Sequence, residues 1–204
     1  GAVLETLPAP LREVVEHLRV LPGVGPKSAL RMALALLNMP RPKAEAFGRS
    51  VLDLRSRLCL CSRCGGLADS DPCRLCADPS RDDAQLCLVA EWDSLLALEE
   101  MAVYKGRYLI LGGLLSPLDG CDPGSLCFDL LRERLASGEV TELILALGAT
   151  VEAESTASYV RNTVSRAFPA VSVSRLAQGI PIGGEVKYMD KETLKQSLAH
   201  RQKM

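Results

Sequence analysis

Apolar residues recur every three or four positions through the first third of the chain, the spacing that places them on one face of a helix. The stretches 8–20, 26–37 and 42–58 each show this period, with charged residues on the other face. Pro10 and Pro26 suit the first turns of the first two stretches. The pattern predicts three helices. The predicted inward face of the third consists of Ala46, Val51, Leu54 and Leu58.

Beyond about residue 82 the pattern changes to short apolar runs that alternate with helical periods. The runs predict strands at 86–90, 108–112, 142–147 and 171–175. The intervening periods predict helices over 93–101, within 124–137 and over 154–168. Short apolar strands that alternate with helices indicate a parallel sheet covered by helices. The fold class is therefore α+β and multidomain, with a helical N-terminal part and an α/β part.

The segment from Leu176 onwards differs in composition from the parts before it. It begins with a loop rich in glycine and proline, and then predicts a short strand from Glu185 to Tyr188 and a final helix from Lys191. We interpret residues 176–204 as a C-terminal strand and helix segment.

Composition and charge limit the function classes. The apolar content of 48% is enough for a core, and no apolar run approaches the roughly 18 residues of a membrane span. Eight cysteines without a secretory segment favour a reducing, cytoplasmic compartment. Lys and Arg exceed Asp and Glu by four up to Cys76, whereas acidic residues are in excess by five afterwards. A basic N-terminal part is compatible with a nucleic-acid surface, and equally with ordinary solvated charge.

Cys61, Cys64, Cys73 and Cys76 form two C-x-x-C pairs separated by a polar, turn-forming segment. Each pair can direct two thiolates at one ion, so this spacing predicts a structural Zn²⁺ site. Disulfides or a redox pair are the alternatives, and disulfides fit the expected compartment less well. Cys59 is a possible substitute ligand, although its C-x-C spacing is less common.

The segment that joins the first two predicted helices reads L-P-G-V-G-P-K-S-A and resembles a helix-hairpin-helix element. Gly23 and Gly25 permit a tight turn and leave backbone amides uncovered, at the start of a helix whose positive end attracts anions. Ser28 lies in the same turn, and Lys27 and Arg31 share one face of the helix. We expect these five residues to bind DNA phosphates. A nucleotide phosphate loop is a poor alternative because the spacing differs, and a turn used only for packing is a second one.

The order of these parts and four further stretches resemble the bacterial recombination-mediator family RecR. The stretches are C-A-D-P-S-R-D at 76–82, G-G-L-L-S-P-L-D-G at 112–120, A-T-V-E-A-E-S-T-A at 149–157 and G-I-P-I-G-G at 179–184. The resemblance implies four parts. They are a helix-hairpin-helix domain at 1–56, a four-cysteine zinc finger at 57–78, a Toprim domain at 79–175 and an oligomerisation segment at 176–204.

Catalytic Toprim domains hold Mg²⁺ with a glutamate after the first strand and a D-x-D pair after a later strand. Here the glutamate position falls on Ala90, with Glu91 one residue late, and the two aspartates are replaced by Gly148 and Thr150. A shift of one residue on a strand points the side chain to the opposite face. The resemblance therefore implies a protein without Mg²⁺-dependent catalysis. The alternative is an enzyme whose rearranged site uses Glu91, Asp119, Glu152 and Glu154.

The family resemblance also implies a mechanism and partners. Family members act in gap repair and recombination in the cytoplasm, at the nucleoid, and assemble as a ring-like tetramer that can surround DNA. They work with the proteins RecO and RecF to help the recombinase load at single-stranded gaps. Glu91, Glu152 and Glu154 are the expected contributors to partner binding. A scaffold that does not contact DNA is a further alternative.

Overall fold

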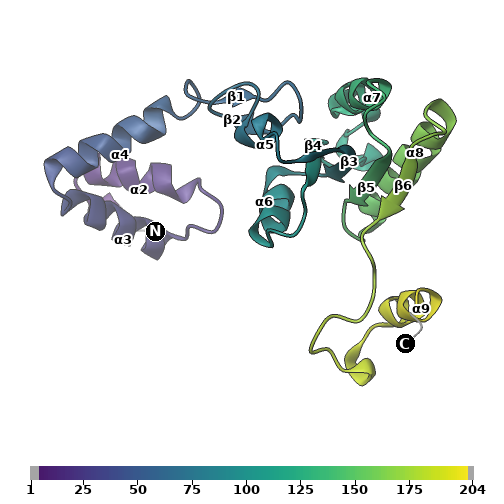
Figure 1. Cartoon of the computed structure of the whole chain (residues 1–204). Helices are drawn as coiled ribbons and strands as arrows, with labels where there is room; N and C mark the ends of the chain where they lie inside the picture. Colours follow the sequence, from purple (N-terminus) through teal and green to yellow (C-terminus); the bar gives the residue numbers. More distant parts are fainter. Residues whose placement is uncertain (1–4, 202–204) are drawn as a thin grey trace. The chain divides into compact units, whose positions relative to one another are not determined.

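The computed structural model describes residues 5–201, and it divides between Arg57 and Leu58 into two compact units (Figure 1). Within the described residues, no helix is long and apolar enough to cross a membrane. The first unit contains helices α2 (Ala9–Arg19), α3 (Pro26–Leu37) and α4 (Arg41–Asp53). These three helices confirm the elements predicted from the apolar periodicity.

The core of the first unit is small. Val15 of α2 and the alanines Ala29 and Ala33 of α3 are buried, and leucines at the margin cover them. Because the two alanines lie four positions apart, they form a flat stripe against which α2 can pack closely. The pairing of α2 with α3 therefore fixes the turn between them.

The predicted inward face of the third helix is wrong for this unit. Helix α4 ends at Asp53, so that Leu54 and Leu58 lie beyond it, and none of its residues is buried. Ala46 and Val51 are exposed as well. The physical reason is that the small core of this unit forms between α2 and α3 alone, and α4 contributes no side chain to it.

The second unit begins with a knuckle that has little regular structure. Strands β1 (Cys59–Leu60) and β2 (Leu67–Ala68) form an antiparallel hairpin, and the short helix α5 (Arg74–Ala77) follows. Gly65 has a φ of +72°, which closes the turn between the two strands. The knuckle leads directly into the main sheet.

The main sheet has four strands in the order β4-β3-β5-β6, and all of them are parallel. Their bounds are β3 (Asp82–Val89), β4 (Gly106–Ile110), β5 (Glu142–Ala146) and β6 (Ser172–Arg175). The parallel arrangement confirms the prediction from alternating apolar runs and helices. The central strands are buried on both faces, which explains their continuous apolar sequences.

Helices cover both faces of this sheet (Figure 1). Helix α6 (Trp92–Glu100) packs on one face together with Leu75 of the knuckle. Helices α7 (Phe128–Ala136) and α8 (Val151–Ala167) pack on the other face. Helix α8 begins three residues before its predicted start because Thr150 caps it, accepting a hydrogen bond from the Ala153 N–H at 3.2 Å.

The C-terminal part contains helix α9 (Lys191–Ala199), which begins after the capping residue Asp190. The short strand predicted from Glu185 to Tyr188 is wrong, since Val186–Tyr188 forms a turn of 3-10 helix. The backbone amides of Tyr188 and Met189 bond to carbonyls three residues earlier, at 3.0 and 3.2 Å. Local hydrogen bonds therefore satisfy a segment that no neighbouring strand pairs with.

A buried arginine joins the knuckle to the sheet. Arg107 lies on β4 and is 6% exposed. Its guanidinium donates to the carbonyls of Leu75 and Cys76 at 2.9 and 3.2 Å, and to Asp83 at 2.7 Å. The Ile110 N–H also donates to the Cys64 carbonyl at 2.8 Å. These contacts hold the knuckle against β4.

Replacement of Arg107 by methionine should lower the free energy of unfolding of the second unit by about 2–4 kcal/mol, because two knuckle carbonyls lose their donor. Urea denaturation followed by the fluorescence of Trp92, the single tryptophan, measures this change. Arg132→Met removes an exposed ion pair with Asp129 and serves as the control, with an expected change within about 0.5 kcal/mol. Equal effects of the two substitutions would contradict the assigned role of Arg107.

Candidate functional site

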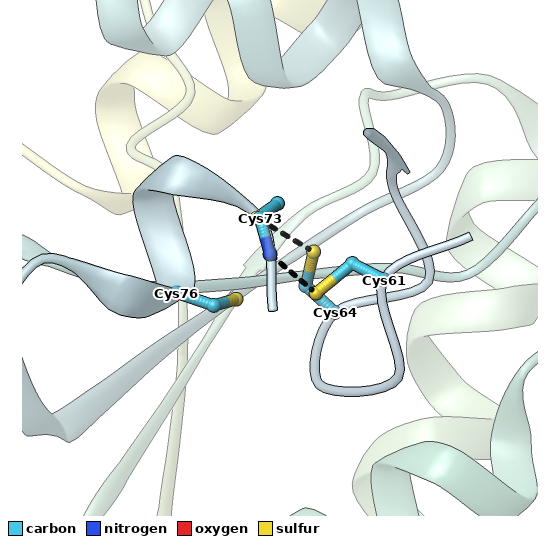
Figure 2. Close-up of side chains that lie close together, drawn as sticks. All are labelled: Cys61, Cys64, Cys73 and Cys76. Atoms are coloured by element: carbon cyan, nitrogen blue, oxygen red, sulfur yellow. Dashed lines mark hydrogen bonds between the residues drawn. The ribbon is translucent and has the colours of Figure 1, made fainter. Parts of the chain in front are cut away.

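Four cysteines come together from the two halves of the knuckle (Figure 2). Cys61 and Cys64 lie in the turn between β1 and β2, whereas Cys73 precedes α5 and Cys76 lies within it. All four are buried, and their sulfurs lie within 4.8 Å of one another. Ideal tetrahedral ligation with Zn–S bonds of about 2.3 Å places sulfurs roughly 3.8 Å apart. The Sγ atoms of Cys64 and Cys73 are 3.7 Å apart, so the residues present fit Zn²⁺.

Backbone amides already point at two of these sulfurs. The Cys73 N–H and the Gly66 N–H donate to the sulfurs of Cys61 and Cys64, each at 3.4 Å. Burial opposes ionisation of Cys61, but the backbone hydrogen bonds outweigh it and lower its pKa to about 7. The pKa of Cys64 is raised by its hydrogen bond with Cys76 and by burial, and burial also raises the pKa of Cys73. Four thiolates packed within 4.8 Å would repel one another, and a divalent cation would offset that repulsion.

The four sulfurs form one group, which suits a single metal ion better than two separate disulfides. All eight cysteines are free thiols, so the pairs are not joined as disulfides. Cys59 is exposed on β1, where its thiol donates to the Ala68 carbonyl at 3.4 Å, and it does not belong to the four-sulfur group. The predicted ligand set is the one that the structure brings together.

Loop groups outside the sulfur shell fix the knuckle. Asp71 accepts hydrogen bonds from the backbone and hydroxyl of Ser62, at 2.8 and 2.9 Å, which ties the two halves together. These bonds hold the pKa of Asp71 below its usual range. A Cβ atom on Gly66 would lie 2.7 Å from the Trp92 ring, so glycine is needed for this close approach to the sheet domain.

The hairpin between α2 and α3 is open to solvent. Gly23 has a φ of +76°, which the turn requires. Gly25 precedes α3 with a φ of −79°, which any residue can adopt, and a Cβ atom there would meet no atom within 4 Å. Neither backbone strain nor packing explains this glycine. Its absence of a side chain leaves room for another molecule to approach the backbone closely.

The start of α3 presents uncapped amides beside positive charge. No side chain caps the helix, which begins with Pro26. Lys27 and Arg31 are exposed, Ser28 is half-buried, and within residues 5–201 neither basic side chain forms an ion pair. Free N–H groups, the positive helix end and two unpaired cations together form a suitable site for phosphate.

The carboxyl edge of the sheet lacks the expected magnesium ligands of a catalytic Toprim domain. Ala90 follows the first strand, which ends at Val89, and Glu91 is the residue that precedes α6. Gly148 has a φ of +91°, a conformation in which an aspartate would be strained. The Thr150 side chain is used to cap α8. The local backbone is thus organised for a turn and a helix cap.

The four carboxylates of the alternative metal site are not gathered into one ligand group in the described part of the chain. Glu154 forms a bidentate ion pair with Arg175, at 2.5 and 3.1 Å, and accepts a hydrogen bond from the Gln178 side-chain amide at 3.3 Å. This pairing holds the pKa of the Glu154 carboxyl below its usual range. Asp119 accepts from the Ser116 hydroxyl at 2.6 Å. Glu91 and Glu152 are exposed.

Four known families match this chain, in the same order as the parts described above. The matching families are the RecR helix-hairpin-helix at residues 11–54, the RecR four-cysteine zinc finger domain at 58–78, the Toprim domain at 84–177 and the RecR C-terminal family at 179–202. Recombination protein RecR of Maridesulfovibrio salexigens is 62% identical over 201 residues, which cover 98% of this chain and 100% of that protein. The chain belongs to the RecR family. The Recombination protein RecR of Nitratidesulfovibrio vulgaris is 58% identical, over 98% of this chain and 99% of that protein. The Recombination protein RecR of Moorella thermoacetica is 42% identical, over 97% of this chain and 98% of that protein.

Membership of the RecR family confirms the predicted recombination class, the fold and the zinc cofactor. The helix-hairpin-helix, the four-cysteine finger and the Toprim domain follow in the predicted order. Sequence reasoning missed Arg107, which carries the contact between the zinc finger and the Toprim sheet. A charged residue at the start of an otherwise apolar strand was the available signal. It also missed Thr156, whose buried hydroxyl joins α8 to a neighbouring loop.

Zinc measurements on the purified protein should give one ion per chain. Cys64→Ser should remove the stoichiometric zinc and loosen the finger, because metal binding supplies most of the folding free energy of such a small knuckle. Cys59→Ser is the matched control and should retain zinc. Loss of metal from Cys59→Ser, or full occupancy in Cys64→Ser, would contradict the assigned ligand set.

Proposed function

We propose that the protein is a non-catalytic recombination mediator that binds DNA in the cytoplasm, at the nucleoid. The observation that carries the proposal is the open hairpin of the helix-hairpin-helix domain, where Gly25 has no structural reason to lack a side chain. A phosphate group can reach the amides at the start of α3, while Lys27 and Arg31 supply charge. Such contacts hold DNA without reading its sequence.

The proposed assembly is a ring-like tetramer that surrounds DNA. A single chain exposes apolar residues that a partner copy could cover, on α4 and in the C-terminal segment. A ring would also multiply the few basic contacts that each protomer offers, and this raises the effective affinity. Gly23, Gly25, Lys27, Ser28 and Arg31 would line the hole.

The proposed partners are RecO and RecF, which would help the recombinase to load at single-stranded gaps. The Toprim domain supplies the docking surface in this proposal, with Glu91, Glu152 and Glu154 as contributors. Glu91 and Glu152 have exposed carboxylates, whereas Glu154 is held by Arg175 and Gln178. The zinc finger acts structurally, because its sulfurs are buried and all four positions of the metal are taken by cysteine.

Replacing Lys27 and Arg31 together by alanine should weaken DNA binding to a similar extent on all sequences. We expect the slope of log K against log salt concentration to fall in magnitude by about two for each protomer in contact, since each cation releases about one counterion. Arg161→Ala/Arg166→Ala removes the same charge from exposed positions of α8 and is the control. An unchanged slope for the first variant would show that DNA binds another face.

The absence of catalysis is tested with labelled single- and double-stranded DNA in Mg²⁺ or Mn²⁺. We expect no cutting or relaxation, because the Toprim metal positions hold Ala90, Gly148 and Thr150. Metal-dependent turnover that persists through further purification and disappears in Glu91→Ala would instead establish an enzyme.

A further inference from the structure

A tight loop after β4 presents a leucine to solvent. Leu118 lies in the 3-10 turn Pro117–Asp119 and is 100% exposed. Val151, the first residue of α8, follows β5 at the same carboxyl edge of the parallel sheet and is 78% exposed. Burying a leucine removes a large apolar area from water and so stabilises a fold. At position 118 this unit does not obtain that stabilisation, because the side chain stays in solvent.

Hydrogen bonds close the loop around Leu118. Ser116 and Cys121 exchange two backbone hydrogen bonds, at 3.0 and 2.9 Å. The Ser116 hydroxyl donates to Asp119, and Gly120 adopts a φ of +73°, which closes the turn. A loop that is already ordered loses little conformational freedom when it binds.

Thr156 fixes the direction of this loop. Its side chain is fully buried, accepts a hydrogen bond from the Leu115 N–H at 2.9 Å and donates to the Glu152 carbonyl at 2.6 Å. The base of the loop is therefore attached to the first turns of α8. Thr156 acts as a positioning residue that places Leu118 relative to Glu152.

Charge on this edge indicates which molecule could cover the leucine. The segments 90–93, 111–129 and 147–154 contain seven acidic residues and no Lys or Arg. The seven are Glu91, Asp93, Asp119, Asp122, Asp129, Glu152 and Glu154. Arg132 pairs with Asp129, and Arg175 at the end of β6 pairs with Glu154, so five of the seven form no ion pair within residues 5–201. Such an edge repels DNA phosphates and attracts a basic protein surface.

We propose that Leu118 is the apolar anchor of a docking surface at the carboxyl edge of the Toprim sheet. The occupant is a partner protein with an apolar pocket surrounded by Lys and Arg side chains. The inference rests on the proposed function, in which the Toprim domain docks RecO, and it adds the residue that would dominate that contact. The acidic residues around the anchor would speed and orient the encounter.

The test measures the Kd between the zinc-loaded full chain and purified RecO from the same genome, by titration calorimetry. Leu118→Ser should weaken binding by about tenfold to a hundredfold, the range expected for burial of one leucine. Leu118→Met keeps the apolar volume and should bind nearly as the wild type does. Thr156→Val should weaken binding by less than Leu118→Ser, because the loop would lose its attachment but keep its anchor.

Val103→Ser is the matched control. Val103 is 79% exposed and precedes β4, at the opposite edge of the sheet, so its replacement should leave the Kd unchanged. If the wild-type protein binds RecO and Leu118→Ser binds it with the same Kd, the anchor role of Leu118 is overturned and the proposed function stands. Wild-type protein that does not bind RecO would overturn both. A smaller light-scattering mass of free Leu118→Ser would assign the surface to a second copy of this chain and so overturn the proposed occupant.

Discussion

The buried guanidinium of Arg107 joins the zinc finger to the Toprim sheet, and the arrangement of the second unit depends on this contact. The finger has almost no apolar core of its own, so zinc must organise it and a neighbour must hold it. Arg107 supplies donors to Leu75 and Cys76, whose carbonyls belong to the metal-binding turn. The close approach of Gly66 to Trp92 completes the joint. Loss of zinc would therefore affect the face of β4 as well as the knuckle.

The two compact units divide the chemistry between them. The first unit offers uncapped amides and the cations Lys27 and Arg31, which suit phosphate. The second unit carries acidic residues at the carboxyl edge of its sheet, where catalytic relatives of the domain would hold Mg²⁺. In this chain the metal positions have become a turn at Gly148 and a helix cap at Thr150. The carboxylates at this edge are not gathered into one metal-ligand group in the described part of the chain.

The elements with strong periodicity could be predicted from the sequence, because their apolar positions are buried within the chain itself. The strands and the helices on both faces of the sheet are of this kind, whereas the four zinc ligands could be predicted from the spacing of their two C-x-x-C pairs. The inward face expected for 42–58 failed because α2 and α3 cover each other and leave that helix exposed. Arg107 and Thr156 could not be found in this way, since their roles depend on contacts between segments 31 and 41 residues apart. The strand expected at Glu185 to Tyr188 failed because no neighbouring strand pairs with it.

The most direct test of the account is the light-scattering mass of the zinc-loaded protein, alone and with gapped duplex DNA over a series of salt concentrations. The account predicts a tetramer that binds the DNA and releases it steeply as salt rises, because phosphate contacts displace counterions. A monomer whose mass does not respond to DNA would contradict it.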